Sequence, residues 1–148
     1  MVRKILLGAL LGYLIVGGAN QDVAQAQAEK RQKLMQEQSA AAKAIKGAVE
    51  AKDYATVEAK AKDLMGSSDR IVGAFPAGSG TGKTKAKPEI WEKSADFANQ
   101  AKSLNKAATE LAAAAKAGND ADVAVKVKAV GDVCGSCHKA FRAEKYAE

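Results

Sequence analysis

Apolar residues recur every three or four positions in the first half of the chain, which is the spacing of amphipathic helices. A first helix is predicted over residues 28–49, and a second follows Asp53, whose carboxylate can cap a helix N-terminus. The first stripe comprises Leu34, Met35, Gln38, Ala41, Ala42, Ile45 and Val49, and the second comprises Val57, Ala61, Leu64, Met65, Ile71 and Val72.

Two more periodic runs occupy the second half. Residues 73–87 contain several glycines and lysines and predict an irregular connection. Pro88 suits the first turn of a third helix, Gly118 suits the left-handed position after its end, and Asn119 or Asp120 can cap a fourth helix. The third stripe comprises Trp91, Ala95, Ala98, Ala101, Leu104, Ala108, Leu111 and Ala115, and the fourth comprises Val123, Val127, Val130, Cys134, Cys137, His138 and Phe141.

These four helices and their mostly short connections predict an all-α fold, an antiparallel up-down-up-down four-helix bundle. No segment shows the alternation of a half-buried strand, and 148 residues suffice for one domain. Because alanine dominates the stripes, the side chains alone form a thin core. A bound cofactor between the helices would supply the missing apolar volume.

The N-terminal segment has the features of a secretory signal peptide. Arg3 and Lys4 precede an apolar run over residues 5–19, and Ala24-Gln25-Ala26 or Ala26-Gln27-Ala28 supplies the cleavage site. We expect residues 1–26 to be removed and residues 27–148 to form the domain. The alternative is an uncleaved anchor, but the apolar run is shorter than the roughly 20 residues that span a bilayer. Export to the periplasm without membrane insertion is the prediction.

The candidate chemistry lies in five residues, Cys134-Gly135-Ser136-Cys137-His138, which contain both cysteines and the only histidine of the chain. C-x-x-C-H is the attachment signature of c-type haem. Residues three and four apart share a helix face, so both thiols and the imidazole point the same way. The cysteines can bond covalently to one haem while His138 binds the iron axially.

Other uses of the same residues fit less well. A thiol redox pair, Cys134 with Cys137, would normally follow a strand in a βα pattern, and no such strand is predicted. A structural zinc site needs four ligands, whereas this segment offers three. Haem c, one per chain, is therefore the predicted cofactor, and the thiol redox protein remains the alternative.

The charge and the remaining motifs exclude several functions. The net charge is +6, or +5 without residues 1–26, and the lysines are spread over helix faces without the interleaved aromatics of a nucleic-acid site. Residues 77–84 resemble a phosphate-binding loop but lack the preceding strand that such a loop needs. The sequence has no second histidine and no acid–base pair of the kind that an enzyme would use, so we do not expect an enzyme. The mild positive charge can help to steer an acidic redox partner.

The arrangement resembles the cytochrome c prime family, a branch of the class II c-type cytochromes. The C-x-x-C-H motif, followed by Phe141-Arg142 on the last helix, is similar to the family's haem attachment segment. Residues 75–79 are similar to its loop, residues 85–91 to its third-helix entry, and residues 31–35 to its first-helix motif. The resemblance covers essentially the whole mature chain.

The resemblance implies further residues near the haem. Arg31 is expected beside a haem propionate and Met35 over the distal face, either as packing or as a sixth iron ligand. Gln32 and Glu89 are expected near the propionates or the haem edge, and Arg142 over the proximal side.

Met35 is compatible with two forms of the family that differ in the coordination of the haem iron. The first is a five-coordinate, high-spin haem that transfers single electrons or binds NO and CO. The second is a low-spin carrier with Met35 bound to the iron, which would tend to raise the reduction potential. The resemblance also implies periplasmic redox partners and a homodimer formed through the first two helices.

Overall fold

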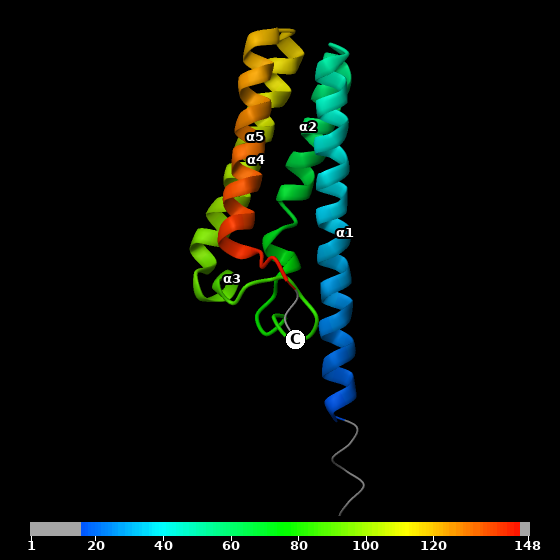
Figure 1. Ribbon diagram of the computed structural model, residues 1–148, viewed down its shortest axis with the longest axis vertical. Coiled ribbons are helices and arrows are strands. Elements are labelled where there is room, and N and C mark those ends of the chain that lie inside the picture. The colour runs from blue at the N-terminus through cyan, green and yellow to red at the C-terminus, as the bar shows by residue number, and fades with distance from the viewer. Residues whose placement is uncertain (1–15, 146–148) are drawn as a thin grey trace, which may run out of the picture.

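The computed structural model describes residues 16–145, so the positive residues Arg3 and Lys4 and most of the predicted signal peptide lie outside the described residues. The regular elements of the described chain are all helices (Figure 1). Its elements are α1 (Val16–Glu50), α2 (Tyr54–Ser68), the 3₁₀ turn η1 (Val72–Ala74), α3 (Glu89–Glu92), α4 (Ser94–Ala117) and α5 (Asp120–Phe141).

Four long helices form the predicted bundle. α1 packs on α2, α2 on α4 and α4 on α5, whereas α1 and α5 make few contacts with each other. Figure 1 shows α1 and α5 standing apart along much of their length. Across residues 16–145 the sole bridge of sheet type joins Ala86 to Arg142. The all-α four-helix bundle is therefore confirmed.

The predicted helix caps are present at both connections where they were expected. The Asp53 carboxylate accepts a hydrogen bond of 3.1 Å from the Thr56 backbone N–H at the start of α2. Gly118 ends α4 in the left-handed conformation with φ of 67°, and the Asn119 side chain accepts from the Asp122 N–H. Local sequence thus fixes both tight connections.

The third predicted helix is wrong as a single element. It is divided into α3 and α4 at Lys93, whose φ of −116° and ψ of 48° lie outside the helical region. The Trp91 indole N–H donates to the carbonyls of Phe75 and Pro76, and Ile90 is buried. These contacts hold α3 against the preceding loop, and α4 starts in a new direction that buries Phe97.

Two other boundaries differ from the prediction. α2 ends at Ser68 rather than Val72, where the hydroxyls of Ser67 and Ser68 donate to carbonyls within the last turn. The chain then makes a 3₁₀ turn that leaves Val72 exposed. α1 begins at Val16 rather than near residue 28 and runs continuously through the predicted cleavage site.

The core is thin, as predicted, with many alanines at the helix interfaces. Its large, fully buried side chains come from three helices: Val57 and Leu64 of α2, Leu111 of α4 and Val123 of α5. At one end of the bundle Phe97 packs edge-on against Phe75 and Phe141, with ring centroids 5.0 and 5.2 Å apart. Within residues 16–145, none of the helices combines the length and the apolar character needed to cross a membrane.

Leu111→Ala should destabilise the bundle, because Leu111 is fully buried between α4 and its neighbours. We expect a loss of about 2–5 kcal/mol in the free energy of unfolding, measured by urea denaturation of the holoprotein. The control is Val125→Ala on α5, where the side chain is 63% exposed and a change below about 0.5 kcal/mol is expected. Equal effects of the two substitutions would contradict the core described here.

Candidate haem site

Cys134, Cys137 and His138 lie on the last two turns of α5. Both cysteines are half-buried against the hydrophobic core. Burial raises the pKa of both thiols, and for Cys137 the neighbouring Cys134 adds to the rise. The uncombined thiols are therefore protonated at neutral pH, which is the weakly reactive form of cysteine.

His138 is exposed at the end of the same face. Partial desolvation, and then the positive charge of Arg142, lower the pKa of its imidazole. The ring is therefore neutral at neutral pH and has a nitrogen lone pair available for a metal.

The end of α5 is held by the loop before α3. The Lys87 N–H donates to the Phe141 carbonyl at 3.0 Å and the Ala143 N–H donates to the Lys85 carbonyl at 2.8 Å. The Lys87 ammonium also donates to the Lys139 carbonyl, one residue beyond His138. These bonds fix the turn that carries the motif relative to residues 85–87.

Arg31 holds the same loop from the opposite side, from α1. Its guanidinium donates to the Ser79 hydroxyl at 3.1 Å and to the Ser79 carbonyl at 2.9 Å, and lies 5.1 Å from the centre of the Phe75 ring. Arg31 is only 4% exposed, and burial lowers its pKa without removing its charge. Among the described residues no carboxylate pairs with it.

The loop therefore brings α1 and α5 into register. Arg31 and Arg142 mark the level at which the loop meets each helix. Met35 lies four residues beyond Arg31, and His138 lies four residues before Arg142. Because the two helices run antiparallel, Met35 and His138 each lie about 6 Å from these contacts in the same direction along the bundle.

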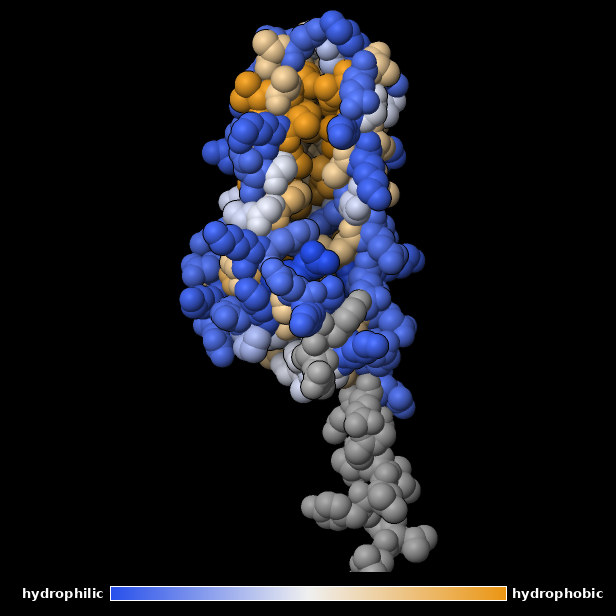
Figure 2. All heavy atoms as spheres, in the orientation of Figure 1, coloured by the Kyte–Doolittle hydropathy of each residue, from blue (hydrophilic) through white to orange (hydrophobic). Residues whose placement is uncertain are grey.

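The other end of this space is also bridged by polar contacts. Asp120, at the start of α5, accepts a hydrogen bond of 2.6 Å from the Lys52 ammonium and another from the Tyr54 hydroxyl. Between the two bridges, Figure 2 shows hydrophobic side chains gathered in a hollow between α5 and α1. Partly buried apolar side chains from both helices contact the core here: Met35, Val49, Val127, Cys134 and Cys137.

These features fit a haem. A porphyrin needs an apolar slot, two thiols on one helix face, a neutral imidazole and a cation for its propionates. The hollow between α1 and α5 brings these features together, with Arg31 as a buried cation that lacks a counter-ion among the described residues. The thin core leaves room on this side of the bundle.

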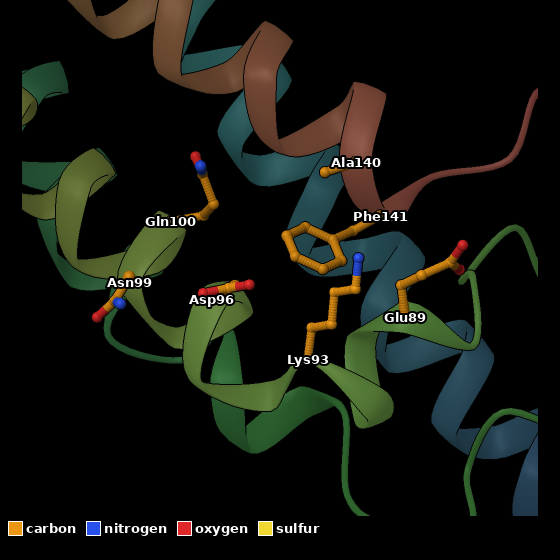
Figure 3. A pocket seen from close by; sticks show the side chains of 7 residues that line it. All are labelled: Glu89, Lys93, Asp96, Asn99, Gln100, Ala140 and Phe141. Carbon is orange, nitrogen blue, oxygen red and sulfur yellow. The ribbon is translucent and has the colours of Figure 1, made fainter.

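Two predicted site residues, Gln32 and Glu89, make no side-chain hydrogen bond with this arrangement within residues 16–145, and their places near the haem stay predictions. Gln32 is exposed on α1. Glu89 lines a separate pocket of about 430 Å³ together with Lys93, Asp96 and Phe141. Figure 3 shows Lys93 and Phe141 extending toward one another in that pocket. Its charged lining is a poor match for a porphyrin ring.

Sequence reasoning missed Ser79 as the partner of Arg31. The two residues are 48 positions apart, and Ser79 is buried in a segment predicted only as an irregular connection. The resemblance included residues 75–79 but assigned no role to this serine. Only the folded loop reveals the contact.

Comparison with known proteins gives a consistent result. The family model described as Cytochrome C' matches residues 26–142. The chain is 39% identical over 85 residues to cytochrome c' of Rhodospirillum rubrum, a match that covers 57% of this chain and just over half, 58%, of that protein. It is 33% identical over 142 residues to cytochrome c' of Rhodopseudomonas palustris, covering 93% and 96% of the two chains.

Solved structures of cytochrome c prime have a similar fold. The nitric oxide complex of a mutant of cytochrome c prime from Alcaligenes xylosoxidans superposes with a TM-score of 0.73 at 26% identity. The superposition covers 82% of this chain and 97% of that chain.

Arg31→Lys should destabilise the protein, because a lysine cannot reproduce the two-point contact with Ser79 or the guanidinium contact with Phe75. We expect a loss of about 1–3 kcal/mol in the free energy of unfolding by urea. Lys33→Ala, at an exposed position of the same helix, serves as the control. If Arg31→Lys is as harmless as the control, Arg31 does not anchor the loop.

Proposed function

The chain belongs to the cytochrome c prime family, and we propose that it is a periplasmic haem protein that transfers single electrons and binds small gases at a five-coordinate haem. The cofactor of this family is one covalently attached haem c. The observation that carries the proposal is the C-x-x-C-H turn of α5, which faces an apolar hollow opposite Arg31 and Met35.

Each residue of the proposed site has a distinct task. Cys134 and Cys137 supply the two thioether sulfurs, and His138 supplies the axial nitrogen. Arg31 offers its remaining N–H donors to a propionate, and Arg142 lies on the His138 side. The haem iron supplies the one-electron redox change and the coordination position for a gas.

Met35 is proposed as a cover of the distal side rather than a ligand. Its side chain packs against the hydrophobic core, which gives the flexible thioether a packing role of its own. A neighbour in the family is a nitric oxide complex, so small-gas binding is known for a protein of this fold. The alternative is a low-spin electron carrier in which Met35 is the sixth ligand.

Met35→Leu separates these two forms. If Met35 only packs, the visible absorption spectra of the oxidised and reduced variant stay those of the parent, with broad high-spin bands, and both proteins bind CO. If Met35 is a ligand, the parent has narrow low-spin bands that the substitution abolishes. The second outcome would replace the proposed gas-binding role with that of a closed electron carrier.

The second candidate class, a thiol redox protein, requires two reactive cysteines. Cys134 and Cys137 instead lie half-buried against the core, and no zinc-type or acid cluster accompanies them in the described part of the chain. Family membership favours the haem protein, and we propose no catalytic residues.

We also propose that residues 1–26 direct export and are then removed. Ala24 is buried near Gly82, so cleavage after Ala26 would shorten α1 and remove this contact with the loop. Arg31 and Met35 would remain one and two turns inside the new N-terminus. The haem site would therefore stay intact.

Two partner surfaces follow from the charges and shape. At the end of α5, the Lys87 ammonium donates to the Lys139 carbonyl, and this bond leaves its positive charge in place for an acidic redox partner. A groove between α1 and α2 is lined by small residues, including Ala40, Ala44 and Gly66, and by charged residues such as Glu37 and Arg70. Close helix approach in this groove suits the homodimer implied by the family.

A further inference from the structure

The inward face of α1 carries one polar side chain that the proposed function does not use. Gln38 shares the stripe with Leu34, Ala41 and Ile45, all of which are buried in the core. Its amide nitrogen Nε2 is buried and finds no hydrogen-bond partner among the residues that the structure describes. A buried donor without an acceptor is unfavourable, so its presence requires an explanation.

Gln38 lies on the same side of α1 as the proposed haem contacts. It follows Met35 by three residues and Arg31 by seven, which is close to one and two helical turns. The other glutamines of this stretch, Gln32 and Gln36, are exposed. The amide is therefore one turn beyond the side chain proposed to cover the distal side.

Several polar groups of the neighbouring α2 are hydrogen-bonded to other parts of the protein. The Ser67 hydroxyl donates to the Leu64 carbonyl, and the Met65 carbonyl accepts from the Ser68 hydroxyl and from Asn105. Near Arg31, the Ser79 hydroxyl already accepts from the guanidinium, which itself has no acceptor to offer. The acceptor for Gln38 is therefore best sought outside the protein, in the hollow between α1 and α5.

We propose that Gln38 donates a hydrogen bond from Nε2 to a small ligand on the distal side of the haem, such as CO, NO or water. This inference rests on the proposed gas-binding function. The hydrogen bond would make the distal side selective among small ligands, because a single amide donor in an apolar pocket favours ligands that carry partial negative charge on their outer atom. Gln38 is thus a specificity-determining residue.

The test uses Gln38→Leu in the holoprotein, with Gln36→Leu as the matched control on the exposed face. The first readout is the infrared C–O stretching frequency of the ferrous CO complex, which a donor to the ligand oxygen lowers. We expect Gln38→Leu to raise this frequency and to speed CO dissociation by about two- to tenfold, as for loss of one hydrogen bond. The control should change neither quantity.

Other outcomes overturn the inference in distinguishable ways. If the parent binds CO but Gln38→Leu leaves the frequency and rate unchanged, the role of Gln38 fails and the proposed function stands. If the parent binds no CO, the gas-binding function fails together with this inference. An equal shift in Gln36→Leu would also overturn the role. Should the leucine variant not fold, as judged by helical circular dichroism, Gln38→Ala removes the same donor and is measured instead.

Discussion

The open side between α1 and α5 is the constraint on which the rest of this structure depends. Three helix interfaces, in which alanines are frequent, are closely packed, and the fourth does not close. Alanine allows two helices to approach closely, but it also supplies little volume to fill a gap between helices held further apart. The separation of α1 and α5 must therefore be fixed by contacts at their ends and filled by something other than side chains.

Polar contacts provide this spacing. At one end, Asp120 of α5 binds Lys52 from the turn after α1 and Tyr54 at the start of α2. At the other end, the loop of residues 75–87 connects Arg31 of α1 to the last turn of α5. A buried arginine is costly unless its donors are met, and Ser79 meets only part of that need. The remaining positive charge is a natural site for the acidic groups of a haem.

Much of this molecule follows from local sequence. Asp53, Gly118 and Asn119 mark helix ends through chemistry that acts within four residues, so the four helices and their order were predictable. The break at Lys93 was not, because it depends on Trp91 reaching carbonyls 15 and 16 residues earlier. The early end of α2 was not predictable for a similar reason, because Ile71 continues the apolar stripe and is buried although it lies outside the helix.

The candidate site, too, was predictable only where it depends on local sequence. The spacing of Cys134, Cys137 and His138 on one helix face follows from the sequence. Their position relative to α1 depends on the folded loop, because no local rule relates positions on α1 to positions on α5. Ser79 and the unpaired amide of Gln38 emerged only from the packed structure.

The most direct test of the account is to find where the haem is attached. Mature protein is denatured, extracted with acidified organic solvent and digested with trypsin, and the peptides are identified by mass spectrometry. The account predicts that the haem stays with the protein and is recovered on the peptide of residues 129–139, whose two cysteines do not react with thiol reagents. Haem released by the extraction, or two reactive thiols on that peptide in folded, exported protein, would contradict it.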